Sequence, residues 1–164
     1  MPSLPTTGHE LHERIREHID RIPELADMLE QHPVPEAFGP RFEAEVAFIT
    51  GTLLPHVAVV EDTLYPELER LMQNRHSMAP MRREHKELAR LIEAMEGYLK
   101  ALRAGHMGMT EAMGLRRVLF RFYAVVKVHL GEEQEYLRVL ERNLSPEEQE
   151  ALGKRIEHAV AHPL

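Results

Sequence analysis

Apolar residues recur at intervals of three and four through most of the chain, which is the spacing of an amphipathic helix. In residues 8–31 the apolar stripe comprises Leu11, Ile15, Ile19, Ile22, Ala26 and Leu29. Stripes with the same spacing run through residues 40–74, 78–103 and 110–143. No segment is a clear candidate for a strand. The pattern therefore predicts four long helices.

Proline and glycine mark where these segments end. Residues 32–35, with prolines at the second and fourth positions, end the first segment. Pro55 and Pro66 fall inside the second segment, which should be kinked or divided into two nearly collinear helices. Residues 105–108 form a loop before the fourth segment, and Thr110 is the expected helix cap.

A serine–proline pair followed by two acids predicts one further helix, from Ser145 to about Val160. Four amphipathic helices with short loops favour an all-α, up-down-up-down four-helix bundle, here residues 8–143. The short C-terminal fifth helix, residues 145–160, is then an addition to it. A length of 164 residues suits one domain spanning 1–164.

Composition narrows the classes of function. A net charge of −7 argues against a nucleic-acid partner, because a basic face is needed to neutralise phosphates. We expect neither a membrane span nor a secretory signal, and hence a cytoplasmic location. The chain has no cysteine, so disulfides and thiolate ligands are excluded. Eleven histidines favour either metal binding through nitrogen and oxygen or a pH-responsive surface.

Histidines interrupt the apolar stripes of all four segments. His129 and Glu133, four residues apart, lie one turn apart on the same helix face, so one ion can bind both. His12, His56 and His85 lie on or beside the stripes of the other segments. One such histidine can be a core residue bonded to a backbone carbonyl. Four, one on each helix of a bundle, favour a metal site of iron, manganese or zinc.

Four motifs follow one another along the chain: Leu11-His12-Glu-Arg-Ile15, Leu54-Pro-His56-Val-Ala-Val-Val-Glu61-Asp62-Thr-Leu-Tyr65-Pro66, Met81-Arg-Arg-Glu-His85 and Val128-His129-Leu-Gly-Glu132-Glu133. Together they resemble the hemerythrin family, in particular bacterial hemerythrin-like HHE cation-binding domains, over about residues 9–150. The resemblance implies two iron ions with an oxo or hydroxo bridge, with zinc or manganese as alternatives. It implies the metal ligands His12, His56, Glu61, His85, His129 and Glu133.

Two positions depart from the family pattern. Members usually carry the second-helix acid four residues after the histidine, where this chain has Val60. Glu61 lies about 140° around the helix from His56, so a locally widened turn would be needed to bring the two together. Oxygen carriers in the family have a second histidine where this chain has Ala89. Fewer histidine ligands are therefore expected, and reversible oxygen carriage is disfavoured.

The weaker candidates each have a plainer interpretation. His18 can replace or join His12, and His9 is a more remote substitute. Asp62 and Glu132 face solvent or orient a ligating imidazole. Tyrosines near the site either approach the metals or pack in the core: Tyr65, Tyr123 and Tyr136. The remaining histidines are expected on the surface: His32, His76, His106, His158 and His162.

The resemblance implies a protein that binds or senses oxygen, nitric oxide, peroxide, iron or redox state. A second hypothesis is a di-iron enzyme that decomposes peroxide or nitric oxide, and the sequence offers no separate acid–base group to favour it. A third, suggested by Val60, is a metal-poor bundle that binds a protein partner.

Overall fold

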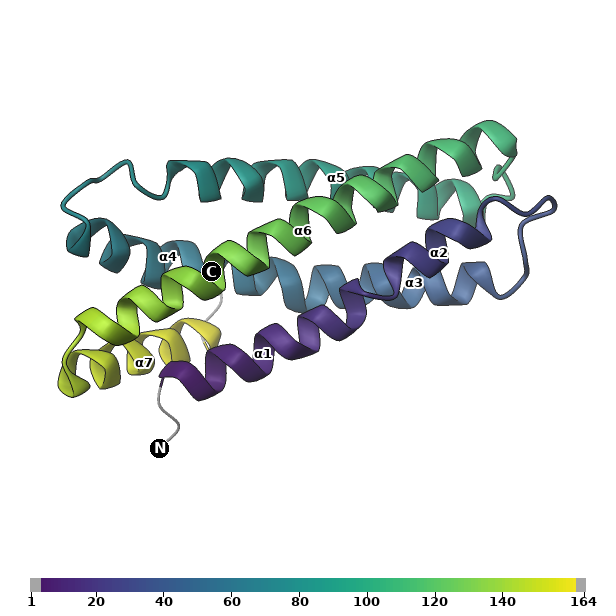
Figure 1. Cartoon of the computed structure of the whole chain (residues 1–164). Coiled ribbons are helices and arrows are strands. Elements are labelled where there is room, and N and C mark those ends of the chain that lie inside the picture. The colour runs from purple at the N-terminus through teal and green to yellow at the C-terminus, as the bar shows by residue number, and fades with distance from the viewer. Residues whose placement is uncertain (1–3, 162–164) are drawn as a thin grey trace.

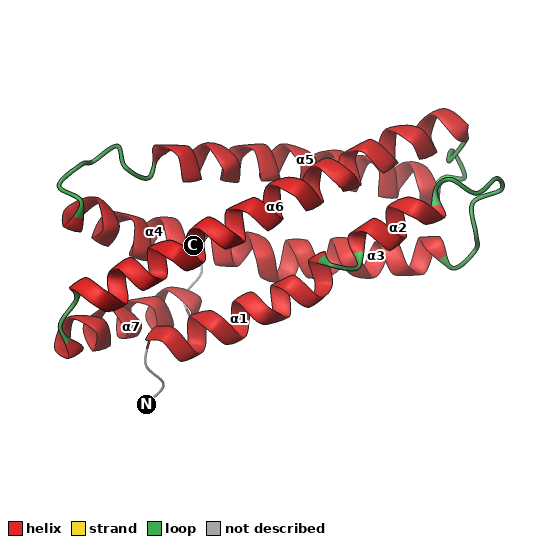
Figure 2. Cartoon of the chain, viewed as in Figure 1, coloured by secondary structure: helices red, strands yellow, loops and turns green. Residues whose placement is uncertain are grey.

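The structure is a computed structural model that describes residues 4–161, with side chains from residue 10 onward. All regular elements in this range are helices, and no strand occurs there (Figure 2). In chain order they are α1 (Leu4–Ile19), α2 (Ile22–Met28), α3 (Phe38–Phe48), the π-helical turn η1 (Ile49–Leu53), α4 (Leu54–Leu71), α5 (Ala79–Arg103), α6 (Met109–Asn143) and α7 (Pro146–Ala161).

These helices form four long rods with one addition (Figure 1). The rods are α1 with α2, then α3 with η1 and α4, then α5, then α6. Helix α7 turns back beside α4 and α1 at one end of the bundle. The predicted all-α bundle with a C-terminal fifth helix is therefore confirmed.

The first rod is divided, where the sequence pattern suggested one helix. Its break lies at residues 20–21, just before Pro23. Proline has no N–H to donate to the carbonyl of Ile19, four residues earlier, and its ring crowds that carbonyl. The chain restarts as α2 with this proline in its first turn, where no donor is needed.

The second rod is divided at Pro55. Pro55 cannot donate to the carbonyl of Gly51, and the turn that precedes it is the π-helical η1. There the N–H of Leu54 donates to the carbonyl of Ile49, five residues earlier. Pro66 lies inside α4 without ending it. The expectation of collinear helices divided at a proline is confirmed.

The helix termini agree with the sequence in one case and not in another. The N–H of Glu148 donates to Oγ of Ser145 at 3.2 Å, and the N–H of Ser145 donates to the carboxylate of Glu148 at 2.8 Å. This reciprocal capping box begins α7 as predicted. The expected cap at Thr110 is wrong, because α6 begins one residue earlier, after the extended residue Gly108.

The apolar core consists of two clusters. The first core cluster includes Phe38, Phe42, Leu88, Leu119, Phe122 and Val126. The second core cluster includes Val60, Leu64, Tyr65, Met81, Leu137 and Leu140. On α4 and α5 the stripe passes from one cluster to the other at a histidine, and on α6 it does so at Glu133, between Leu130 and Leu137. Buried polar side chains therefore lie where the two clusters meet.

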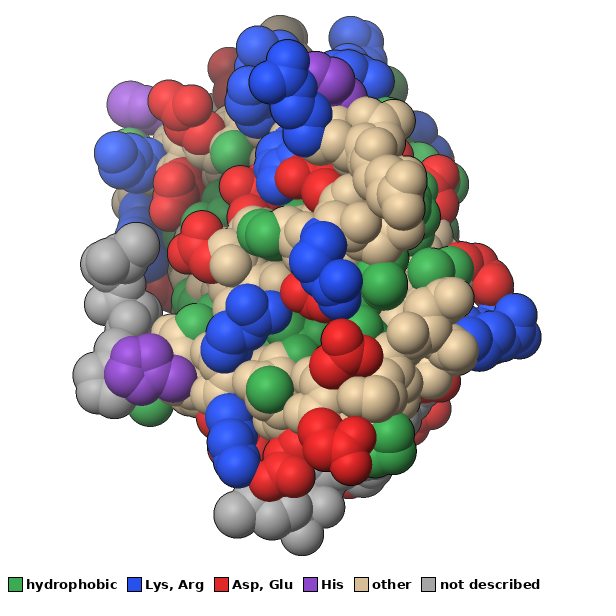
Figure 3. All heavy atoms as spheres, turned by 90° about the vertical axis from the view of Figure 1, so that its left-hand side faces the viewer, with side chains coloured by type: hydrophobic (Ala, Val, Ile, Leu, Met, Phe, Trp, Pro, Cys, Tyr) green, Lys and Arg blue, Asp and Glu red, His purple; other side chains and the backbone are tan. Residues whose placement is uncertain are grey.

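Charged side chains of both signs alternate over the end of the bundle that holds α7 (Figure 3). Two ion pairs there join α7 to α4: Arg155 with Glu67 at 3.6 Å, and Arg70 with Glu148 at 3.7 Å. Both arginines and Glu148 are more than half exposed, so each pair adds little stability. Burial of Leu152 in the second core cluster is the larger contribution to holding α7 in place.

Residues Phe38–Leu71 form a helix long and apolar enough to cross a membrane, judged by length and composition alone. Core helices of bundles meet the same two criteria. In this fold the segment is one wall of the bundle (Figure 1). The expectation of no membrane span stays a prediction.

Candidate metal centre

Five of the predicted ligands meet inside the bundle. His12 comes from α1, His56 from α4, His85 from α5, and His129 and Glu133 from α6. Each lies at the level where the two core clusters meet. Glu133 is only 1% exposed, and the histidines from α1, α5 and α6 are also buried. The four rods thus direct imidazole and carboxylate groups into an otherwise apolar interior.

One half of the centre is the His12 group, consisting of His12, His56 and Glu133. Nε2 of His12 lies 2.8 Å from Oε1 of Glu133, and Nε2 of His56 lies 2.9 Å from the same oxygen. The two imidazole rings meet edge to face with centroids 5.2 Å apart. One candidate ligand atom from each residue lies within 4.8 Å of the others, which is compact enough to bind one ion.

The other half is the His85 group, consisting of His85, His129 and Glu133. Nε2 of His85 lies 2.9 Å from Nε2 of His129, which is 3.1 Å from Oε2 of Glu133. Candidate ligand atoms of this group also lie within 4.8 Å of one another. The hydroxyl of Tyr65 lies 3.1 Å from Nε2 of His85. Glu133 belongs to both groups, so its two oxygens face two neighbouring cation positions.

Two carboxylates lie behind the imidazoles of the His85 group. Nδ1 of His85 donates to Oε1 of Glu61, and Nδ1 of His129 donates to Oε2 of Glu84, each at 2.6 Å. A carboxylate carries no proton, so Nδ1 must be the donor in both pairs. This fixes the tautomer of each neutral ring and turns the Nε2 lone pair toward the centre.

The pKa values reflect this packing. Burial alone would raise the pKa of Glu133, but the imidazoles of His12, His129 and His56 hold it well below the usual range. Burial likewise opposes a charge on His129, yet Glu133 and Glu84 outweigh it and raise its pKa. Burial lowers the pKa of His85, and Glu61 does not offset this. Burial and three nearby carboxylates raise the pKa of Tyr65.

The donor set fits a cation. With both Nδ1 atoms donating outward, neutral His85 and His129 turn two lone pairs toward each other across 2.9 Å. Oε2 of Glu133 is buried beside them and accepts no hydrogen bond from any described residue. Converging acceptors in a low-dielectric interior require a positive charge between them. Imidazole and carboxylate without thiolate suit iron, manganese or zinc.

The structure places Glu61 outside both groups. Its carboxylate is about one-third exposed and contacts the far nitrogen of His85. The widened turn of this rod is η1, which precedes His56 and therefore does not change the angle between His56 and Glu61. The sequence pattern did not predict a role for Glu84. The one signal it offers is the position of this residue directly before His85.

The structure shows where the two residues that depart from the family pattern lie. Val60 is 2% exposed and belongs to the second core cluster, so the position four residues after His56 contributes to the core. Ala89 is exposed, one turn after His85 on α5. A longer polar side chain at that position would start from the surface of the bundle.

The weaker candidates lie elsewhere. His18 stacks on Phe48 with ring centroids 3.6 Å apart, and its Nδ1 lies 3.3 Å from Oε2 of the buried Glu45. Asp62 and Glu132 are exposed. Contact with the protein partly desolvates the Glu132 carboxylate, and this, with the neighbouring Glu84, raises its pKa. Of the three tyrosines that could approach the metals or pack in the core, two pack against the core clusters: Tyr123 on the first and Tyr136 on the second.

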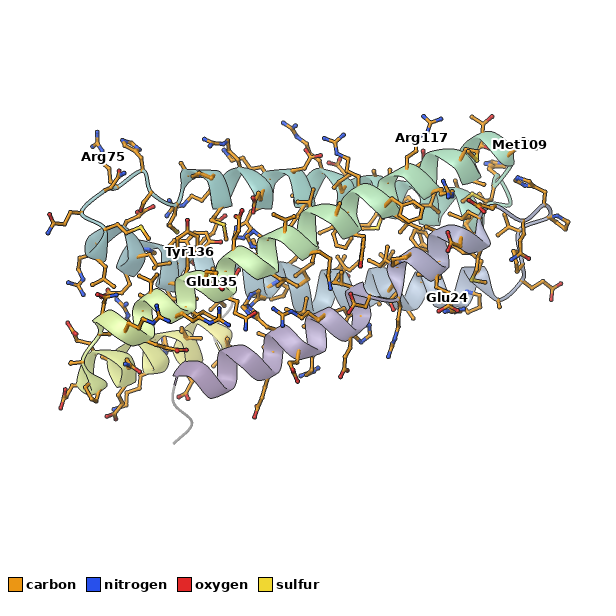
Figure 4. The ribbon with its side chains drawn as sticks, in the orientation of Figure 1. Glu24, Arg75, Met109, Arg117, Glu135 and Tyr136 are labelled. Carbon is orange, nitrogen blue, oxygen red and sulfur yellow. The ribbon has the colours of Figure 1, made fainter. Side chains whose placement is uncertain are left out.

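Within the described residues, the histidines that were expected on the surface are exposed: His32, His76, His106 and His158. His162 and the side chain of His9 lie outside the described residues. Figure 4 shows Arg75 and Arg117 pointing away from the bundle, in contrast to the buried groups of the centre.

A four-helix bundle that directs histidines and a shared buried carboxylate into its core defines a helical metal-binding protein. Residues 7–140 match the model of the hemerythrin family, which is described as the hemerythrin HHE cation binding domain. The chain therefore belongs to this family. Searches of curated proteins and of solved structures found no match.

Proposed function

We propose that this chain is a non-haem di-iron protein that binds or senses a small molecule such as oxygen, nitric oxide or peroxide, or iron and redox state. The observation that carries the proposal is Glu133, a buried carboxylate with two imidazole nitrogens within 2.9 Å of one oxygen and a third 3.1 Å from the other. Such a shared carboxylate is the arrangement that holds two metal ions side by side in helical bundles.

In this proposal His12 and His56 hold one ion, His85 and His129 hold the other, and Glu133 binds both. A pair of irons, when bound, would supply electron transfer and the binding of a small ligand. Zinc or manganese would fit the same donors, and zinc would remove the redox function.

The surroundings of the centre favour small ligands. Both core clusters abut it, with Val126 and Leu130 in the first and Val60 in the second. These apolar side chains make the interior around the centre largely non-polar. Tyr65 contributes a buried hydroxyl beside His85, which can donate a hydrogen bond at the centre. A diatomic ligand or peroxide suits this apolar environment with one hydrogen-bond donor.

Metal content and absorption test the proposal together. The chain is produced with added iron, analysed for metal, and its ultraviolet–visible spectrum is recorded before and after exposure to air. We expect two irons per chain and, after air, the near-ultraviolet bands of an oxo- or hydroxo-bridged iron pair. Less than one metal per chain would reject the proposal and favour the metal-poor bundle.

The same iron-loaded protein distinguishes a sensor from an enzyme. Stoichiometric addition of peroxide or nitric oxide under anaerobic conditions should change the spectrum once, with at most a few equivalents consumed. Sustained consumption of many equivalents would instead identify an enzyme that decomposes the ligand. Substitution of Glu133 by Ala should abolish either response, because both halves of the centre depend on this residue.

A further inference from the structure

The two halves of the centre differ in the residues that support their imidazoles. In the His85 group each Nδ1 donates to a carboxylate, Glu61 or Glu84, at 2.6 Å. In the His12 group, Nδ1 of His12 is buried and has no hydrogen-bond partner among the described residues. Within the same part of the chain His56 makes its hydrogen bond only through Nε2. Only in the His85 group, therefore, do carboxylates fix the tautomer that turns the Nε2 lone pair toward the centre.

A carboxylate behind a ligating imidazole strengthens metal binding in two ways. It holds the ring in the tautomer and orientation that present Nε2, and it makes that nitrogen more basic. Removing such a partner typically lowers metal affinity about 10–100-fold. The His85 group has two of these partners and the His12 group has none in the described residues.

The charges near the two halves also favour a cation in the His85 group. Behind the His85 group lie the carboxylates of Glu61 and Glu84, in addition to the shared Glu133. One turn after His12 on α1 is Arg16, which donates to Gln134 and forms no ion pair with a described carboxylate. A cation in the partly buried interior is therefore attracted more strongly by the first environment than by the second.

We propose that Glu61 and Glu84 are positioning residues that make the His85 group the tighter metal position, filled first, and leave the His12 group as the weaker and exchangeable one. This ranking rests on the two-metal centre proposed above. The affinity of the His12 group then sets the metal concentration at which the centre becomes complete. A half-loaded and a fully loaded form would thereby report metal supply.

Titration of the metal-free full-length chain with Co²⁺ tests this ranking. Visible absorption follows the stoichiometry, and proton NMR follows the paramagnetically shifted N–H protons of ligating histidines. We expect two separate steps. The first step should bring two shifted N–H signals that exchange slowly with water, because the Nδ1 protons of His85 and His129 are held by carboxylates.

Substitutions assign each step. The double variant Glu61→Gln, Glu84→Gln should weaken the first step by about 10-fold or more, and its two N–H signals should exchange faster. Glu93→Gln, at an exposed position on the same α5, removes one charge as a matched control and should titrate like the parent chain. The His12→Ala variant should keep the first step and lose the second.

Two results would overturn the ranking: loss of the first step in His12→Ala, or an unchanged first step and unchanged N–H exchange in the double variant. Failure of the two-metal proposal looks different. If the parent chain binds a single Co²⁺ whose N–H signals vanish in His129→Ala, the two-metal centre is rejected, while the preference for the His85 group stands.

Discussion

Nε2 of His12 lies 2.8 Å from Oε1 of Glu133, although 121 positions separate the two residues in the sequence. The contact joins the first helix to α6 and is completed by His56 from α4, on the same oxygen. Three of the four rods are thus held together by one carboxylate oxygen. A buried negative charge is tolerable here because several imidazoles surround it.

Loss of single ligands should follow this geometry. The Glu133→Ala variant should lose metal from both halves, because its side chain belongs to each. The His129→Ala variant should lose metal from the His85 group. His18→Ala should retain the metal content of the parent chain, since His18 contacts Glu45 and Phe48 instead. Elemental analysis after dialysis measures this, and equal retention in all three variants would contradict the assignment.

Tyr65→Phe tests the hydroxyl beside His85. Without metal, burial and carboxylates raise the pKa of this phenol, so it is neutral and donates to the imidazole. A ferric ion at the His85 group would favour the phenolate instead. We then expect a visible phenolate-to-iron absorption that is absent from Tyr65→Phe and retained in Tyr136→Phe. A spectrum unaffected by Tyr65→Phe would show that the hydroxyl does not bind iron.

Removal of metal should destabilise the fold. An ion that binds only the folded chain, at a free concentration one thousand times its dissociation constant, adds about 4 kcal/mol. For a chain of this length that is about 8–16 °C in melting temperature. Thermal unfolding with and without chelator measures the difference. Chelator should leave the melting temperature of Glu133→Ala unchanged, and an equal shift there would point to metal bound elsewhere.

The contact between α5 and α6 can be tested without metal. A Cβ at Gly97 would have no atom within 4 Å, whereas a Cβ at Gly114 would lie 2.1 Å from the Tyr98 hydroxyl. Gly97→Ala should therefore stabilise its helix by up to about 1 kcal/mol. Gly114→Ala should gain less or lose stability, because Tyr98 must move. Urea unfolding measures the stability of both variants, and equal gains would show that Tyr98 can move away from Gly114 without cost.

The sequence alone was sufficient to predict the features that depend on local geometry. Each helix has its own apolar stripe, and a histidine within a stripe is visible without knowing the neighbouring helix. His129 and Glu133 share one face because a spacing of four stacks side chains in any α-helix. The capping box at Ser145 and the division at Pro55 are likewise properties of neighbouring residues.

Tertiary structure decided how these groups combine. Which histidines pair, and that Glu133 lies between both pairs, depends on the rotation and axial offset of the packed helices, which the two core clusters fix. Glu61 and Glu84 lie beside their stripes, so their contacts are with the imidazoles of neighbouring helices. A single helix does not encode such contacts, because they form only where two helix surfaces meet.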